Sequence, residues 1–219
     1  SRVLVHESVA DVFFQKLKQA TESILLGQEA EGQFSMGPMT THKQFKKVHE
    51  YLALAEQEQL TALIDVNNIS CPTQGFYIRP QSYIDVPTNS RLWKEEIFGP
   101  IMPVIVWKTK EEVLQIVRKN RYPLACYMFS EDKKFINYII ENVEFGGGCI
   151  NNALAHYGNS HMPFGGVMTS GMGKYHGHHS FLTFSNSKPV LNSASLLDLH
   201  IWYPPYTDTK TTRIEKVVG

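Results

Sequence analysis

The sequence lacks the features that mark several classes of protein. No run of apolar residues is long enough to span a bilayer, and the opening segment SRVLVHESVADVFF lacks the order of regions of a signal peptide. Lysine plus arginine number 21, as do aspartate plus glutamate, so no large field points toward DNA, RNA or an anionic membrane. We therefore expect a cytoplasmic protein with neither nucleic acid nor a membrane as its partner.

Cysteine is scarce, and no metal-binding pattern is evident. The three cysteines, Cys71, Cys126 and Cys149, are widely spaced and form no C-x-x-C, which indicates a reducing compartment rather than a disulfide framework. The histidines of HGHH, with His156 and His161 upstream, have no carboxylate or cysteine close by in sequence. Histidines that cap or face solvent are favoured there over a metal site, so we expect no metal.

The common phosphate-binding and hydrolase motifs are also missing. In MPFGGVMTSGMGKYHG, residues 162–177, a Walker pattern would need glycine at Met168 and Ser or Thr at Tyr175, and G-x-G-x-x-G fails at His176. No serine lies in a G-x-S-x-G elbow. The glycines of this segment instead permit close backbone approach, as in loops that line ligand sites.

Strands alternate with amphipathic helices over the first part of the chain. We expect strands at residues 2–6, 60–66, 75–86, 101–108, 123–129 and 147–152. We expect helices over residues 41–57, after N-caps at Ser8 and Ser130, and after the capping box that Thr109 and Glu112 form. The first helix should bury a stripe of five residues: Val9, Phe13, Leu17, Ala20 and Ile24.

This alternation predicts an α/β fold with an open, mostly parallel, twisted sheet flanked by helices. The nearly continuous apolar run at residues 101–108 predicts a strand that is covered on both faces. After about Phe184 the alternation fails, and strand-like pieces mix with Pro and Thr. We therefore divide the chain into a domain at 1–184 and, at 185–219, a C-terminal arm and tail that pack on something other than their own core.

Two adjacent carboxylates, Glu95 and Glu96, precede Phe98 and a Gly-Pro turn, just before the predicted buried strand. Open α/β folds bind ligands beside the sheet edge, which suits a site at this place. Taken alone, the motif favours a pair of acids in water at a helix end, with Phe98 as an ordinary core residue. Cys149, in GGGCINN, is typical of a small hydrophobe in a strand rather than of an activated thiolate, although Asn151 and Asn152 beside it could face a pocket.

Taken together, EEIFGP and the later PFGGVMTSGMG resemble the aldehyde dehydrogenase superfamily. The segments GGGCINNALAHY, GMGKYHGHHSFLTFS and WYPPYTD are most similar to its class 3 branch, the fatty and aromatic aldehyde dehydrogenases. The resemblance implies an NAD- or NADP-dependent oxidation of apolar or aromatic aldehydes to carboxylic acids. In that chemistry a catalytic cysteine attacks the aldehyde, hydride passes to nicotinamide, and water activated by a glutamate hydrolyses the thioester.

The resemblance also assigns residues. It implies that Glu96 binds the hydroxyls of the nicotinamide ribose and that Phe98 contacts the nicotinamide, while Glu95 is structural. It further implies that Asn151, His156 and Phe164 border the substrate tunnel, with core or interdomain packing as the alternative for each.

None of the three cysteines matches the family's G-Q-x-C motif, which lies just upstream of a strand like SRVLVH. We therefore expect a C-terminal fragment of a catalytic domain, without the nucleophile, the general-base glutamate or the glycine-rich cofactor segment, and inactive alone. The alternative is a natural non-catalytic domain with a role in assembly or regulation. The segment Phe181–Leu191 resembles the family's oligomerisation strand, which implies a homo-oligomer.

Overall fold

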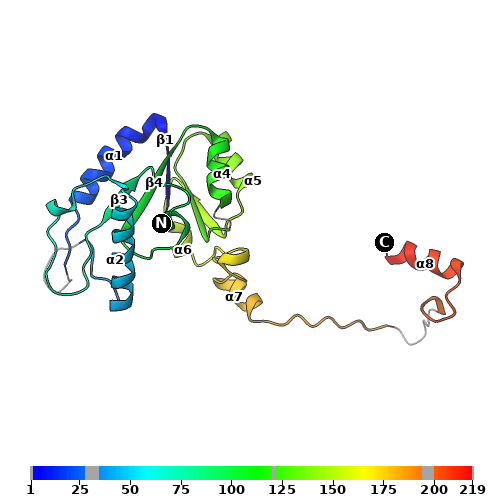
Figure 1. Cartoon of the computed structure of the whole chain (residues 1–219). Helices are drawn as coiled ribbons and strands as arrows, with labels where there is room; N and C mark the ends of the chain where they lie inside the picture. Colours follow the sequence, from blue (N-terminus) through cyan, green and yellow to red (C-terminus); the bar gives the residue numbers. More distant parts are fainter. Residues whose placement is uncertain (1, 28–34, 120–121, 194–199, 219) are drawn as a thin grey trace.

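The computed structural model describes residues 2–27, 35–119, 122–193 and 200–218. Figure 1 shows an α/β body from which an extended C-terminal segment leads away to a distal helix. Of the predicted arm and tail, residues 194–199 and 219 lie outside the described residues.

The six predicted strands and the four predicted helices are present in the predicted order, and the described residues form four further helices, α3, α6, α7 and α8. The strands are β1 (Val3–His6), β2 (Thr61–Ala62), β3 (Gln81–Ile84), β4 (Ile101–Trp107), β5 (Ala125–Met128) and β6 (Gly147–Ile150). The helices are α1 (Glu7–Glu22), α2 (His42–Gln57), α3 (Arg91–Lys94), α4 (Lys110–Lys119), α5 (Lys133–Asn142), α6 (Ala155–Gly158), α7 (Gly177–Thr183) and α8 (Asp208–Val218).

The strands form two sheets that are mostly parallel. In the larger sheet, of order β1-β4-β3-β2, strand β4 pairs in parallel with β1 and β3, and the short β2 joins β3 antiparallel. Strands β5 and β6 pair in parallel in a second sheet. The predicted open, mostly parallel α/β fold is therefore confirmed, with its strands divided between two sheets.

Strand β4 is the centre of the body because helices cover both of its faces. Met102, Val104 and Val106 belong to one apolar cluster, together with residues of α1. Ile101 and Ile105 belong to another, built around α2. Since successive side chains of a strand point to opposite faces, this division places α1 and α2 on opposite sides of the sheet. The predicted burial of this strand on both faces is confirmed.

Helix α1 begins earlier than predicted and buries a different stripe. Its N-cap is His6, whose Nδ1 accepts from the Ser8 main-chain N–H at 3.2 Å, so the prediction of a Ser8 cap was wrong. The helix buries Ala10 and Thr21, and Val9 is 53% exposed. Thr21 can be buried because its hydroxyl donates to the Leu17 carbonyl at 2.7 Å.

The caps of the next helices largely follow the sequence. Thr109 and Glu112 form the predicted capping box: Thr109 Oγ1 accepts from the Glu112 N–H, and Glu112 Oε2 accepts from the N–H of Lys108 and of Thr109. Helix α5 is capped by Asp132 rather than by Ser130, because the Asp132 carboxylate accepts from two N–H groups of the first turn.

Two predicted strands are shorter than expected. The segment at 60–66 pairs only over Thr61–Ala62, because Asp65 accepts from the Asn67 N–H and starts a 3-10 turn. The segment at 75–86 pairs only over Gln81–Ile84. Pro80 stands directly before that strand, and proline has no N–H to donate to a ladder.

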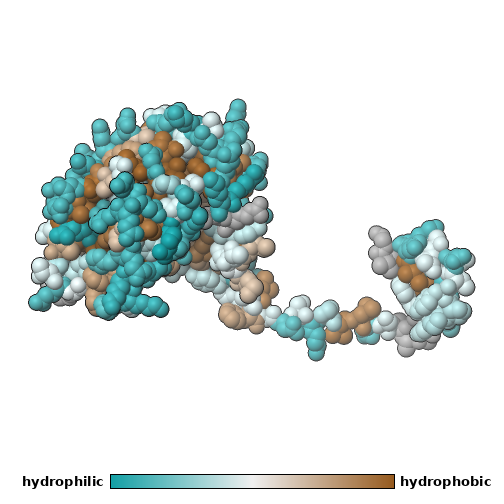
Figure 2. Space-filling model, viewed as in Figure 1, coloured by the Kyte–Doolittle hydropathy of each residue, from teal (hydrophilic) through white to brown (hydrophobic). Residues whose placement is uncertain are grey.

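The segment after α7 leaves the body as an extended, exposed chain. Phe184, Val190 and Leu191 are 90%, 77% and 91% exposed, and Figure 2 shows hydrophobic residues along this extension. The expected oligomerisation strand at Phe181–Leu191 is helical where it begins, because α7 runs to Thr183. The division into a domain and an arm, and the pairing of the arm with a partner, stay predictions.

Candidate functional site

The EEIFGP turn, residues 95–100, connects α3 to β4 and is held against α2 (Figure 1). The side-chain amide of Gln44, on α2, donates to the carbonyls of Ile97 and Phe98, both at 2.8 Å. At Gly99 a Cβ atom would lie 2.4 Å from Cγ2 of the buried Val48, also on α2. Only glycine lets the turn approach the helix this closely.

Phe98 is held in a strained conformation with its ring in the open. Its φ of 54° lies in the left-handed region, which costs free energy for a residue with a side chain. Phe98 is 71% exposed, so it is not the ordinary core residue that the motif alone favours. Backbone strain combined with an exposed aromatic ring is typical of a position that contacts a ligand.

Glu95 is engaged within the protein. Arg91 donates to its carboxylate from Nε at 2.8 Å and from Nη2 at 3.2 Å, and the hydroxyl of the buried Tyr51 donates at 2.7 Å. The hydrogen bonds from Arg91, and next from Tyr51, lower the pKa of Glu95 to about 2. This geometry agrees with a structural role for Glu95.

The neighbouring carboxylate of Glu96 is exposed and makes no hydrogen bond or ion pair with a described residue. Its main-chain carbonyl is held, because Lys47 Nζ donates to it at 3.0 Å. Arg2 donates to the carbonyls of Trp93 and Lys94. Burial lowers the pKa of Arg2, and the nearby negative charge of Glu96 partly opposes this effect. Glu96 thus keeps both oxygens available on a fixed backbone.

In a second region, aromatic rings lie close together around the PFGG segment, residues 163–166. We call it the aromatic cluster; its rings are those of Tyr127, His156, Tyr157, Phe164, Tyr175 and His176. The centroid of Phe164 lies 5.4 Å from that of His156, 5.2 Å from Tyr157 and 5.5 Å from Tyr175. These separations are in the range for favourable aromatic pairs.

The backbone of this region is tied together by Lys174. Its ammonium donates to the carbonyl of Gly146, at the entry of β6, at 2.8 Å and to that of Gly165 at 2.6 Å. Phe164 and Tyr175 exchange two main-chain hydrogen bonds, at 3.0 and 2.9 Å. At Gly165 a Cβ atom would lie 2.5 Å from the Gly173 carbonyl, which explains the glycine.

His156, on α6, is only 5% exposed. Its Nδ1 lies 3.5 Å from Cys149 Sγ on β6, and its Nε2 has no hydrogen-bond partner among the described residues. The ring therefore forms part of the packed interior of the aromatic cluster while one of its nitrogens contacts a thiol.

Asn151 follows β6 directly and is held by its own side chain. Its Oδ1 accepts from the Ser130 N–H at 2.8 Å, and its Nδ2 donates to the Ser130 carbonyl at 3.0 Å. Its φ of 52° is one that asparagine tolerates better than most residues. The amide thus clamps the end of β6 to the end of β5.

The predicted site residues therefore fall into two groups. His156 and Phe164 are in contact, and Asn151 lies one residue beyond the strand that carries Cys149. Among the described residues, no hydrogen bond or ring contact joins Glu96 or Phe98 to this group. Their assignment to cofactor and substrate stays a prediction.

Sequence reasoning missed the residues that hold these two groups in place. Gln44 lies in no motif, and the motif that contains Lys174 does not indicate its role, since the partners of both residues lie far away along the chain. The pairing of Cys149 with His156 had a weak signal in a spacing of seven residues, but only the bend between β6 and α6 brings the two together.

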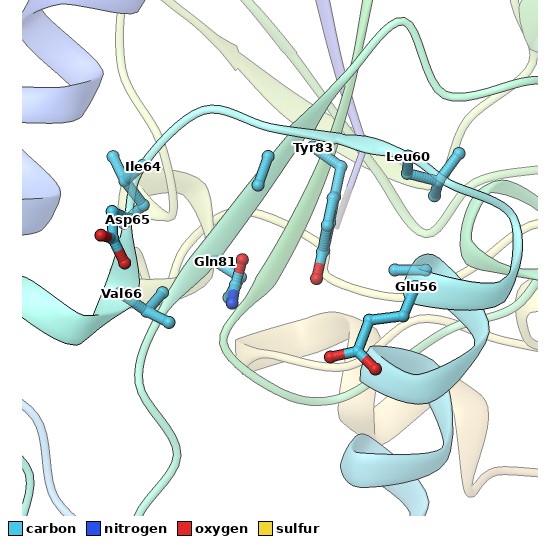
Figure 3. Close-up of a pocket in the computed structure, with 9 residues that line it drawn as sticks. Glu56, Leu60, Ile64, Asp65, Val66, Gln81 and Tyr83 are labelled. Atoms are coloured by element: carbon cyan, nitrogen blue, oxygen red, sulfur yellow. The ribbon is translucent and has the colours of Figure 1, made fainter.

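A hollow of about 250 Å³ lies elsewhere, between the end of α2 and the β2–β3 edge. Figure 3 shows Glu56 from α2 beside Gln81 and Tyr83 from β3, with Asp65 at the other side. Burial, and next the charge of Glu56, raises the pKa of Tyr83. None of the predicted site residues lines this hollow, so it is not the site that the motifs indicate.

Two further searches cover the described residues only. None of their helices is both long and apolar enough to cross a bilayer. Within the same ranges, no three His, Cys, Asp or Glu side chains converge on a position for a metal ion.

Comparison with known proteins gives consistent matches. A model of the aldehyde dehydrogenase family matches residues 1–190. A 4,4'-diaponeurosporen-aldehyde dehydrogenase of Staphylococcus aureus is 33% identical over 93% of the chain and 43% of its own length. A dimeric, NADP-preferring aldehyde dehydrogenase of Canis lupus familiaris is 34% identical over 93% of the chain and 43% of its own length.

The structural comparison agrees. The substrate-bound state of Staphylococcus aureus AldH matches with a TM-score of 0.78 and 31% identity, over 100% of this chain and 46% of that one. NAD+ complexes of aldehyde dehydrogenases occur among the other structural matches. The chain spans less than half the length of these relatives.

Proposed function

Since the chain belongs to the aldehyde dehydrogenase family, we propose that it is part of an enzyme that uses NAD or NADP to oxidise apolar or aromatic aldehydes to carboxylic acids. The reaction would proceed through a cysteine thioester. The observation that carries the proposal is the pair formed by Glu96 and Phe98. The carboxylate has both oxygens available and the ring is exposed, while side chains of α2 hold the backbone of both residues.

The donor and acceptor chemistry of this turn fits the nicotinamide half of a dinucleotide. A carboxylate is an acceptor with two oxygens, so Glu96 can accept from both hydroxyls of a ribose. The Phe98 ring offers an apolar face beside it. When bound, the cofactor supplies the hydride acceptor; the role of this chain is to orient it, since two fixed contacts restrict how the ring can lie.

The aromatic cluster supports the proposed class of substrate. We propose that Asn151, His156 and Phe164 border the tunnel that the aldehyde enters. Tyr157 and Phe164 add apolar surface at this place, which favours an apolar or aromatic aldehyde over a charged one. The face of His156 that packs on Phe164 would contribute shape rather than a proton.

We further propose that these 219 residues alone do not oxidise aldehydes. None of the three cysteines stands in the family's nucleophile motif, and burial raises the pKa of Cys126.

The exposed apolar residues of Phe181–Leu191 suit a homo-oligomer contact. The same exposure is what a non-catalytic domain used for assembly would show, so that function is the second candidate. Three free cysteines suit a cytoplasmic location.

The test compares two neighbouring carboxylates in the whole protein. Glu96→Gln should slow hydride transfer by about tenfold, because it weakens hydrogen bonds of a charged acceptor worth roughly 1.5–3 kcal/mol. Single-turnover formation of NADH or NADPH, followed by absorbance with hexanal and with benzaldehyde, measures the effect. The melting temperature should not change.

Glu95→Gln is the matched control, because it makes the same chemical change one residue away. It should leave the single-turnover rate unchanged and lower stability slightly. Equal rates for wild type and Glu96→Gln would contradict the cofactor assignment. Absence of any aldehyde oxidation by the whole protein would favour the assembly role.

A further inference from the structure

Cys149 and His156 form a thiol–imidazole pair. The proposed oxidation uses the ring of His156 only as part of the tunnel wall and assigns no role to its contact with the thiol. Cys149 Sγ lies 3.5 Å from His156 Nδ1, within the distance of a hydrogen bond to sulfur. The cysteine stands on β6 and is partly exposed, whereas the histidine stands on α6 and is only 5% exposed. The residue that carries the thiol is thus more open to solvent than the residue that carries the imidazole.

Among the described residues, the thiol of Cys149 is the polar group that the His156 ring contacts. Its Nε2 is buried and has no hydrogen-bond partner among the described residues, although buried polar atoms usually have one. Two ring contacts, with Tyr127 at 5.6 Å and with Phe164 at 5.4 Å, fix the plane of the imidazole. A ring held in this way keeps Nδ1 directed at the sulfur, where it can accept the thiol proton.

Cys126, on the neighbouring strand, shows what the same residue type does without this partner. The register pairs Cys126 with Gly148 and Tyr127 with Cys149, so the two cysteines point to opposite faces of the sheet. Cys126 packs against the apolar cluster of α4 and α5, and burial raises the pKa of its thiol. The chain thus contains an inert cysteine as an internal reference.

We propose that Cys149 and His156 form an activated-thiol site that adds covalently to soft electrophiles of the α,β-unsaturated carbonyl class. In this addition His156 Nδ1 takes the proton from the thiol, and Sγ bonds to the β-carbon. The electron pair of the C=C bond moves to the α-carbon, which then receives the proton from the imidazolium. All atoms of both reactants stay in the adduct, and neither an oxidant nor a reductant is needed.

The chemistry of the site selects this class. A thiolate is a soft nucleophile and reacts readily at a soft carbon. The rings around His156 are apolar, so a small unsaturated carbonyl compound with an apolar chain fits better beside them than a charged disulfide does. The proposal rests on contacts within the aromatic cluster and is independent of the proposed oxidation.

The test measures how fast each cysteine is modified in the native protein and in the same protein unfolded in urea. The probe is 2-hexenal, with iodoacetamide as a second reagent, and mass spectrometry of peptides gives separate rates for Cys149 and Cys126. Folding by itself can only shield a cysteine. A native rate for Cys149 that exceeds its unfolded rate, by about tenfold, therefore reports activation. Cys126 should react more slowly in the native protein than in urea.

The variant His156→Gln tests the role of the imidazole. It keeps a polar side chain but removes the ring nitrogen, so the Cys149 rate should fall to about that of the unfolded chain while the Cys126 rate stays the same. A native Cys149 rate at or below the unfolded rate in wild type would overturn the proposal, whatever the variant does. So would an unchanged rate in a folded His156→Gln protein.

Discussion

The EEIFGP turn and the aromatic cluster hold their residues in opposite ways. In the turn, Gln44 and Lys47 bind main-chain carbonyls, and the side chains of Glu96 and Phe98 make no hydrogen bond or ring contact with a described residue. In the aromatic cluster the side chains bind one another, as the contacts of Phe164 show. A fixed backbone with free side chains suits a ligand that supplies the missing contacts. Side chains that pack together suit a wall, whose contribution is shape.

Both regions hold residues with positive φ, but they stabilise them differently. Phe98, at 54°, depends on the amide of Gln44 from another element. Asn151, at 52°, depends on its own amide, which binds Ser130. Substitutions that remove each support therefore test whether the two regions are independent. The expected decrease in the free energy of unfolding differs from one substitution to the next.

The largest loss is expected for Lys174→Met. The ammonium donates to Gly146 and Gly165, and hydrogen bonds from charged groups are worth roughly 1.5–3 kcal/mol. Removing it leaves two carbonyls without that donor, so the free energy of unfolding should fall by about 2–3 kcal/mol. Urea unfolding followed by circular dichroism measures it. Lys188→Met, on the exposed arm, is the control and should change stability by less than about 0.5 kcal/mol. Equal effects of the two variants would show that Lys174 is not an anchor.

The next effect concerns Asn151, whose side chain both clamps Ser130 and lies in the predicted tunnel wall. Asn151→Ala should lower the free energy of unfolding by about 2 kcal/mol. It removes two hydrogen bonds and places alanine, which has a β-carbon but no amide, at a positive φ. Asn151→Gly loses the same hydrogen bonds but tolerates the φ, so it should cost about 1 kcal/mol less than alanine. Thermal unfolding of both variants measures the difference. Wild-type stability in both would mean that the residue serves only the substrate.

The local signals in the sequence were sufficient where a structure depends on neighbours along the chain. Thr41 and the Thr109–Glu112 box are caps whose partners lie three residues away, so the starts of α2 and α4 could be predicted. The cap of α1 could not, because His6 is not a usual capping residue. The sequence predicts a longer strand than β3, because the extended segment continues on both sides of Pro80, which has no N–H to donate to a ladder.

The supports of the candidate site could not be predicted, because they join distant segments. Gln44 and Ile97 are 53 residues apart, and Lys174 and Gly146 are 28 apart. No single-residue pattern carries such contacts. The resemblance of EEIFGP predicts a cofactor role for Glu96 and Phe98. The structure adds that α2 holds their backbone, while their side chains make no hydrogen bond or ring contact with a described residue. The sequence predicts only a small hydrophobe at Cys149, because the contact with His156 depends on a turn that includes Leu154 at a φ of 63°.

A smaller effect is expected for Gln44→Ala in the turn. It removes two neutral hydrogen bonds, each worth roughly 0.5–1.5 kcal/mol, so stability should fall by about 1–2 kcal/mol. Gln44→Glu is the matched variant, since it keeps the size of the side chain but has no N–H to donate to the two carbonyls. It should be at least as destabilising as alanine in urea unfolding at neutral pH. If the glutamate variant is as stable as wild type, the amide does not hold Phe98.

The smallest effect concerns how the contribution of Glu95 to stability depends on pH. Glu95 is paired with the exposed Arg91 and with the Tyr51 hydroxyl, so Glu95→Gln should lower the free energy of unfolding by under about 1 kcal/mol at neutral pH.

The pKa of Glu95 in the folded protein is about 2, below the ordinary value of 4.5, so ionised Glu95 stabilises the folded state. That contribution is complete above pH 4.5 and is lost as the pH falls through this window toward 2. The difference in unfolding free energy between wild type and Glu95→Gln should therefore shrink across this range. A difference for Glu95→Gln that stays constant from neutral pH down to about 2 would mean that the lowered pKa does not contribute to stability.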